Sequence, residues 1–217
     1  MEITYLGHSS FRLKGKSAVV LTDPFDPLMV GLKFPKTTAD IVTVSHGHDD
    51  HNKTALVSGV KMIINEPGEY EVMGVSVIGI HTNHDDKNGE ERGGNTIYLY
   101  EIDGLRLCHL GDLGHKLDDG VVEELGTLDI LMIPVGGIYT IDPKTASEIV
   151  RSIEPSITIP MHFKRSGMNM ETFGELSEVG DFLKEVSMVV EESDKLTIKK
   201  NDLLEGESRV VVMSPKI

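Results

Sequence analysis

The feature that most constrains this chain is a cluster of histidines and aspartates directly after a short β-branched run. Residues 41–44, Ile-Val-Thr-Val, predict a buried strand, and Ser45 and Gly47 allow the backbone to turn after it. The pattern H-x-H-x-D-H then supplies four candidate metal ligands within six residues: His46, His48, Asp50 and His51. A loop this tight can direct several side chains at one point.

Imidazole and carboxylate ligands together favour zinc, with manganese or iron as alternatives, because calcium and magnesium prefer shells of oxygen alone. Four such ligands in one short loop are too many for a single tetrahedral ion that keeps a position open for catalysis. We therefore expect two divalent metal ions side by side. The alternative is a polar loop with exposed histidines, and the density of the cluster argues against it.

Length and composition predict a single globular domain over residues 1–217, with 39% hydrophobic residues to build its core. No apolar run is long enough to cross a membrane, and the chain begins with strand-like residues in place of a signal peptide. The single cysteine, Cys108, excludes an internal disulfide and agrees with a reducing compartment. We expect a cytoplasmic protein that does not contact the membrane.

The net charge of −14 argues against a nucleic-acid partner, because such partners need a basic surface that neutralises phosphates. A small anionic substrate remains compatible with this charge if the metal ions attract it. A small-molecule substrate is therefore the expected partner, and a homo-oligomer stays open.

The hydrophobic pattern predicts strands first, and then helices alternating with strands. Runs at residues 3–6, 10–13 and 18–21 predict an antiparallel meander. Residues 97–102 and 105–110 flank Asp103-Gly104, a turn typical of hairpins. Helices are expected after Asp118, after Asp142 and from Leu176 to Leu183, and a short one within residues 53–59. The pattern indicates an α/β fold with two sheets face to face and helices outside.

Three further segments are candidates for the neighbourhood of the metal loop. Asp23, at the tip of the third strand, could accept hydrogen bonds from the loop or from a ligand histidine, or simply form an Asx turn. Residues 25–38 carry apolar side chains without periodicity, which suggests either a pocket wall or lid or an oligomer contact. His81 and His84 compete for one ligand position.

The ordered phrases GHSSF, TDP, SHGHDDHN, HDD, HLGD and PMH resemble the metallo-β-lactamase-fold hydrolases over nearly the whole chain. Within that superfamily the chain is similar to the compact metal-dependent hydrolases near the ascorbate-6-phosphate lactonase-like proteins. The resemblance implies a four-layer αβ/βα sandwich. It also implies one metal on His46, His48 and His84, a second on Asp50, His51 and His162, and Asp112 as the bridge. His84 is preferred over His81 because it precedes Asp85, as the family pattern H-D prefers.

The remaining candidates have supporting or substrate-binding roles. His8 is either a loop residue near the site or a hydrogen-bond donor to a ligand, and His109 is expected to hydrogen-bond beneath the site. Tyr139 could donate its hydroxyl to a substrate, and Lys164 and Arg165 could hold a carboxylate or phosphate.

Together these features predict a metal-dependent hydrolase that uses a hydroxide activated by two metals on a small ester, lactone or amide. Asp50 is the expected catalytic residue that orients this hydroxide and receives its proton. One alternative is a phosphodiesterase or nuclease, although no basic clamp is visible. The other is a non-hydrolytic redox or metal-binding protein, although redox relatives usually carry glutamate where this chain has His48.

Overall fold

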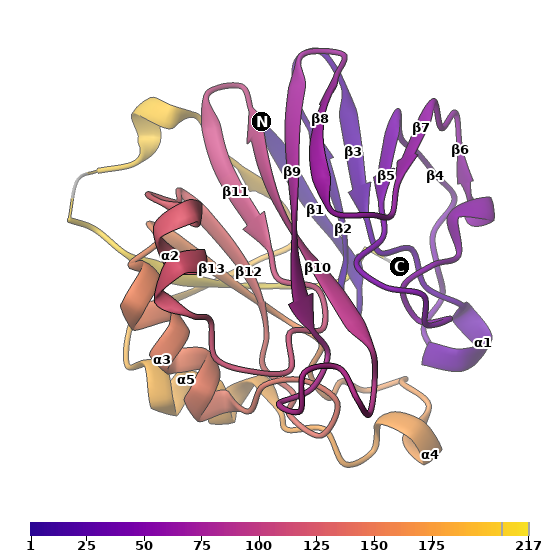
Figure 1. Ribbon diagram of the computed structural model, residues 1–217, viewed down its shortest axis with the longest axis vertical. Helices are drawn as coiled ribbons and strands as arrows, with labels where there is room; N and C mark the ends of the chain where they lie inside the picture. The colour runs from indigo at the N-terminus through magenta and orange to yellow at the C-terminus, as the bar shows by residue number, and fades with distance from the viewer. Residues whose placement is uncertain (205, 217) are drawn as a thin grey trace.

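The computed structural model describes residues 1–204 and 206–216, and its strands form two large sheets that face each other (Figure 1). The first sheet has the strand order β15-β1-β2-β3-β5-β7. Its strands are β1 (Glu2–Gly7), β2 (Ser10–Lys14), β3 (Val19–Thr22), β5 (Ile41–Thr43), β7 (Met62–Ile64) and β15 (Leu196–Thr197). The predicted antiparallel meander forms β1 to β3, and β3, β5 and β7 run parallel.

The second sheet has the strand order β14-β16-β13-β12-β11-β10-β9-β8. Its strands are β8 (Gly68–Val72), β9 (Val75–Asn83), β10 (Gly94–Ile102), β11 (Leu105–His109), β12 (Ile130–Pro134), β13 (Ile157–Met161), β14 (Val189–Ser193) and β16 (Arg209–Met213). Neighbours from β14 to β11 are parallel, and those from β11 to β8 are antiparallel. Asp103 and Gly104 join β10 to β11 with φ values of 56° and 80°, as the predicted hairpin turn requires.

Period-two alternation within the strands of the second sheet divides its side chains between two cores. Tyr98 and Tyr100 of β10 point into the core between the sheets, whereas Ile97 and Leu99 point toward the helices. The outer face is covered by α2 (Asp119–Leu125), α3 (Pro143–Ile153) and α5 (Val179–Val186) (Figure 1). The apolar residues of these helices therefore pack on one face of the sheet, as predicted.

The helix boundaries agree with the sequence in part. Asp142 caps α3, because its side chain accepts a hydrogen bond from the backbone N–H of Thr145. Asp118 precedes α2 but makes no such capping bond. The last helix begins at Val179 and not at Leu176, because Leu176 belongs to an apolar cluster with Phe25 and Phe173.

Among the described residues, a layer without long helices covers the outer face of the first sheet. It consists of irregular segments with β4 (Thr37–Thr38), β6 (Val57–Ser58) and the 3₁₀ turn η1 (Thr54–Leu56), where a short helix was predicted. A longer helix in the segment before β5 is prevented by Pro24, Pro27, Gly31 and Pro35. The mixed α/β architecture with two facing sheets is nevertheless the predicted one.

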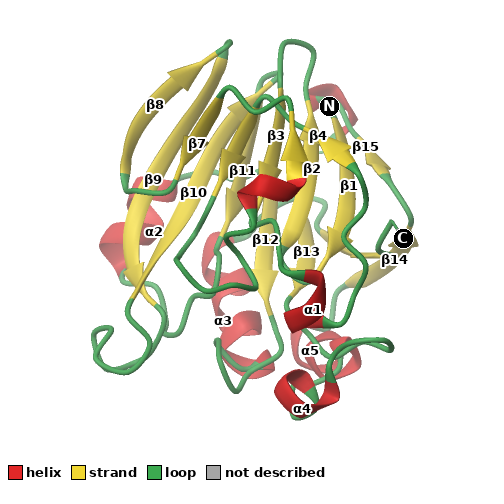
Figure 2. Cartoon of the chain, turned by 90° about the vertical axis from the view of Figure 1, so that its right-hand side faces the viewer, coloured by secondary structure: helices red, strands yellow, loops and turns green. Residues whose placement is uncertain are grey.

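Two single-turn helices lie together at one end of the sandwich (Figure 2). They are α1 (Pro27–Val30) and α4 (Met170–Phe173), and η2 (Lys200–Asp202) lies elsewhere, before β16. Gly31, with φ of 84°, ends α1 so close to α4 that a Cβ there would clash with the backbone nitrogen of Asn169. In the described part of the chain, no helix combines the length and apolar character that a membrane span needs.

Candidate metal centre

The predicted ligands meet because each follows the carboxyl end of a strand. His84 directly follows β9, Asp112 comes three residues after the end of β11, and His162 directly follows β13. The strands β9, β11 and β13 point the same way, since β9 is antiparallel to β10, which is antiparallel to β11. The loop 46–51 follows β5 of the facing sheet. The two sheets thus bring their ligands together at one edge.

Asp112 lies at the centre of the cluster. Its Oδ2 atom is 3.2 Å from Nε2 of His162, 3.3 Å from Nε2 of His51 and 3.4 Å from Nε2 of His84. Nε2 of His46 lies 3.9 Å from the same oxygen. One buried carboxylate therefore faces four imidazoles from three separate segments of the chain.

The potential ligand atoms form groups around this carboxylate. One group consists of His46, His48 and His84, and another of His8, Asp50, His51 and His162, with ligand atoms within 4.8 Å of one another in each group. These two groups contain the sets that the family resemblance implied, with His8 added to the second, and a third group joins His46, His51 and Asp112. His81 has an exposed side chain, whereas His84 is 2% exposed and faces Asp112.

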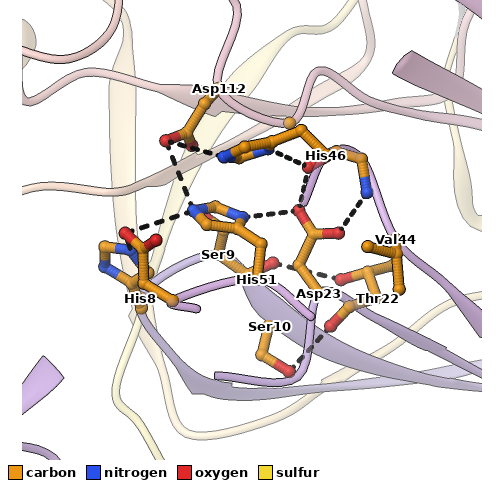
Figure 3. A network of polar contacts seen from close by, with 12 residues as sticks. His8, Ser9, Ser10, Thr22, Asp23, Val44, His46, His51 and Asp112 are labelled. Atoms are coloured by element: carbon orange, nitrogen blue, oxygen red, sulfur yellow. Dashed lines mark hydrogen bonds and ion pairs between the residues drawn. The ribbon is translucent and has the colours of Figure 1, made fainter. Parts of the chain in front are cut away.

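Asp23 orients two of these histidines from below (Figure 3). Its Oδ2 accepts hydrogen bonds from Nδ1 of His51 at 2.8 Å and from the hydroxyl of Ser45 at 2.7 Å, and its Oδ1 accepts from the backbone N–H of Ser45 at 2.7 Å. The Ser45 hydroxyl in turn accepts from Nδ1 of His46 at 2.9 Å. Asp23 thereby fixes the ring orientation that leaves both Nε2 atoms facing Asp112.

His8 supports Asp50 in a similar way. Nε2 of His8 lies 3.1 Å from Oδ2 of Asp50, and an ionised carboxylate can only accept, so the imidazole is the donor. His8 is 2% exposed and has φ of 54°. His162 and Asp23 also adopt left-handed conformations, with φ of 49° and 39°. Non-glycine residues of this kind gather at functional sites, where the surroundings hold them in place.

Further contacts hold Asp112 itself. Its backbone N–H donates to Oδ1 of Asn95 at 2.9 Å, and the amide nitrogen of Asn95 donates to Oγ1 of Thr82 and to the carbonyl of Leu110. His109 lies beneath, where its Nε2 donates to the carbonyl of Ser9 at 2.8 Å and its Nδ1 accepts from the N–H of Gly111. The sequence indicated the role of His109, but no pattern singled out Asn95.

The electrostatics of the cluster favour a bound cation. Burial opposes the charged form of His51, but three nearby carboxylates outweigh it and hold its pKa well above the ordinary value. These carboxylates belong to Asp112, Asp50 and Asp23. Burial would raise the pKa of Asp112, yet His162 and His51 hold it well below its usual range. The three carboxylates thus stabilise a positive charge at this position, which either a proton on His51 or a bound metal ion can supply.

The donor set also fits metal ions chemically. Several buried polar atoms that face the cluster have no hydrogen-bond partner among the described residues: Nε2 of His46, Nε2 of His51, Nε2 of His162 and Oδ1 of Asp112. Buried polar groups are rarely left unpaired, since each costs about 1–3 kcal/mol. Neutral imidazole nitrogens and ionised carboxylates are the ligands that zinc, manganese and iron accept.

The metal-free protein should lose stability as the pH falls from about 7 to about 5. Burial, and next the neighbouring His162, lower the pKa of His8 from 6.5 to about 4, and burial with His51 lowers that of His46 to about 3. At pH 5 these histidines are therefore protonated in the unfolded chain but not in the folded chain. This difference lowers the free energy of unfolding by about 2 kcal/mol for each histidine. The pKa of His51 is raised in the folded chain, so its protonation adds stability as the pH falls. This gain offsets less than about 1 kcal/mol of the loss.

Urea unfolding of chelator-treated protein at the two pH values measures this loss. His8→Gln, which cannot be protonated, should lose less stability across the same range. Equal stability at both pH values would contradict the assigned burial of neutral histidines.

A pocket of about 300 Å³ opens onto the cluster. It is lined by Met29, His48, Asp50, His84, Arg92, Asp112, Tyr139, Thr172 and Phe173. The segment 25–38 contributes Met29 through α1, so this segment supplies part of the pocket wall. The ring of Tyr139 lines the pocket, while its hydroxyl donates to the carbonyl of Thr172 at 2.9 Å.

Lys164 and Arg165, predicted to hold a substrate anion, do not line this pocket. Nζ of Lys164 donates to the carbonyl of Gly174, and the Arg165 guanidinium donates to the carbonyl of Met213 at 2.9 Å. The guanidinium also lies over the rings of Tyr5 and Phe163. Closeness to His162 in sequence was misleading, because both side chains bind backbone carbonyls of other segments and not the pocket. Arg92, which no sequence pattern singled out, is the basic residue at the pocket.

Comparison with known proteins identifies relatives over most of the chain. The beta-lactamase superfamily domain matches residues 2–162. The UPF0173 metal-dependent hydrolase of Thermoplasma acidophilum is 32% identical over 75% of this chain and 83% of its own length. The corresponding protein of Carboxydothermus hydrogenoformans is 30% identical over 83% of this chain and 92% of its own length.

A solved structure agrees with these sequence relatives. It is a protein from Thermotoga maritima described as a candidate Zn-dependent hydrolase of the metallo-β-lactamase superfamily. The two chains superpose with a TM-score of 0.79 at 36% identity, and the match covers 98% of each.

Proposed function

The chain belongs to the metallo-β-lactamase superfamily of metal-dependent hydrolases, and from this premise we propose that it hydrolyses a small ester, lactone or amide with two divalent metal ions. The observation that carries the proposal is the position of Asp112, whose single Oδ2 atom faces imidazoles of both ligand groups. A carboxylate shared in this way suits a pair of ions better than one.

We assign the ligands from these groups. His46, His48 and His84 would hold one ion, Asp50, His51 and His162 the other, and Asp112 would bridge them. Zinc is the first choice, in line with the description of the Thermotoga maritima protein, and manganese and iron are the alternatives. When bound, such a pair of ions supplies Lewis acidity and a water molecule acidified toward neutral pH.

Asp50 is the residue that we propose to handle the proton. Its carboxylate lines the pocket, and the hydrogen bond from His8 to Oδ2 holds it where it could also accept a proton from the attacking water. Burial would raise the pKa of Asp50, but His51 and His8 outweigh this effect and hold it below the usual range. Asp50 is therefore ionised and ready to accept at neutral pH.

The pocket supports a small substrate. Its volume of about 300 Å³ is at the lower end of the range for small-molecule sites. Among the described residues, Arg92 is the one lysine or arginine at the pocket, and the net charge is −14. A nuclease would need a basic track for its phosphates, so the nuclease alternative has no support in these residues.

The test is a hydrolysis assay on zinc-reconstituted protein with γ-lactones, δ-lactones, aryl esters and aryl amides, with and without a chelator. His84→Ala should lose activity by about 100-fold or more, because it removes a proposed ligand. His81→Ala is the matched control, since His81 belongs to β9, the strand that leads to His84, and its side chain is exposed.

Chelator-sensitive turnover that His84→Ala abolishes and His81→Ala keeps would support the proposal. Equal loss in both variants, or turnover that survives complete metal removal, would overturn it.

A further inference from the structure

The pocket contains a guanidinium that the proposed metal chemistry does not use. Arg92 lies in the loop between β9 and β10 and lines the pocket together with ligands from both groups. Among the described residues, its guanidinium makes no ion pair and no hydrogen bond, although the chain has 35 acidic residues against 21 basic ones. Other lysines near this edge are paired: Lys53 with Asp49, and Lys87 with Glu91. The free charge of Arg92 is thus unusual in this neighbourhood.

The loop that carries Arg92 is held in a fixed shape. The buried carboxylate of Asp85 accepts hydrogen bonds from four backbone N–H groups of this loop, including that of Arg92 at 2.8 Å. Such a network fixes the backbone before any ligand arrives, so less ordering is needed on binding.

The side chain of Arg92 is held in place by the aromatic ring of Tyr139. The Arg92 guanidinium carbon lies 5.9 Å from the ring centre of Tyr139, and the hydroxyl of Tyr139 is tied to the carbonyl of Thr172 at 2.9 Å. Attraction between guanidinium and ring holds the cation over an aromatic face and leaves its N–H edge available. Arg92 is therefore a preorganised donor that lacks an acceptor.

We propose that Arg92 binds the carboxylate of a small monoanionic substrate and so determines the substrate class of this hydrolase. This inference rests on the proposed function, because it names what occupies the pocket beside the metal ligands. A planar guanidinium matches a carboxylate through two parallel hydrogen bonds. One arginine balances one negative charge, and the apolar walls formed by Met29 and Phe173 suit a short uncharged body next to it. The substrate is a carboxylate-bearing lactone, ester or amide.

The test measures binding without turnover. Two hydrolysis-resistant ketones serve as probes: 3-benzoylpropionate, which carries a carboxylate, and butyrophenone, which has a methyl group in its place. Their dissociation constants are measured by NMR titration of the zinc-loaded and the metal-free protein. Arg92→Ala should raise the dissociation constant of 3-benzoylpropionate about 10- to 100-fold and change that of butyrophenone by no more than about twofold. The affinity of Arg92→Lys for 3-benzoylpropionate should lie between those of the original chain and Arg92→Ala. Lys87→Ala, in the same loop, should bind both probes as the original chain does.

Two outcomes would overturn the inference. One is equal affinity of the original chain for both probes. The other is a preference for 3-benzoylpropionate that Arg92→Ala retains, which would assign the carboxylate to the metal ions. Carboxylate binding that depends on Arg92, in a protein that hydrolyses nothing in the panel even when carboxylate-bearing esters and lactones are added to it, would leave this inference standing and reject the proposed function. Hydrolysis of carboxylate-bearing esters with a KM that Arg92→Ala leaves unchanged would do the reverse.

Discussion

Asp112→Asn should reduce hydrolytic activity by about 1000-fold or more and lower the metal content of the protein. The carboxylate of Asp112 faces Nε2 atoms of three histidines at 3.2–3.4 Å, so it is the one group shared by both proposed ligand sets. An amide keeps the size of the side chain but removes the negative charge that would lie between the two proposed cations. Kinetics on the best substrate and elemental analysis of the same sample measure the two effects.

The matched control is Asp49→Asn. Asp49 lies in the same sequence cluster, but its side chain is 62% exposed and pairs with Lys53. This variant should keep full metal content and activity, because exposed ion pairs contribute little. A metal content in Asp112→Asn equal to that of Asp49→Asn would refute the bridging role.

Asp23→Ala should destabilise the protein by about 3–5 kcal/mol and weaken metal binding about 10- to 100-fold. Asp23 is 1% exposed and accepts three hydrogen bonds, two from Ser45 and one from His51. Alanine would leave these donors buried without an acceptor and would release the ring of His51. Urea unfolding of the metal-free protein gives the loss of stability, and competition with a chromogenic chelator gives the loss of affinity.

Asp26→Ala is the matched control, because it removes a nearby carboxylate that makes no hydrogen bond with the described ligand histidines. Asp26 accepts from the backbone N–H of Leu28 and caps α1, so its removal should cost about 1 kcal/mol without changing metal affinity. The assigned role of Asp23 fails if both variants lose equal stability or if Asp23→Ala binds zinc as tightly as the original chain.

The sequence was most informative where structure depends on local patterns. Period-two alternation predicted the strands that position the cluster, and Asp103-Gly104 predicted the hairpin before Asp112. The family resemblance implied His84 and His162 as ligands, and the expected strands placed both at strand ends, where side chains can converge on one edge. Asp23 was also a candidate because it lies at a strand tip. In the structure its carboxylate accepts hydrogen bonds from Ser45 and His51.

Sequence alone was less informative where long-range packing decides the direction of a side chain. Lys164 and Arg165 are close to His162 along the chain, but their side chains bind the carbonyls of Gly174 and Met213, which lie further along the chain. Asn95 holds Asp112 across two strands, a contact that neither segment encodes by itself. Arg92 reaches the pocket only because Asp85 folds its loop back, and nothing in the loop composition indicates that shape.

The most direct test of the two-metal centre is elemental analysis of the protein after reconstitution with excess zinc and removal of unbound metal. We expect two equivalents of zinc per chain, because Asp112 faces histidines of both proposed ligand sets. One equivalent, or none, would contradict it.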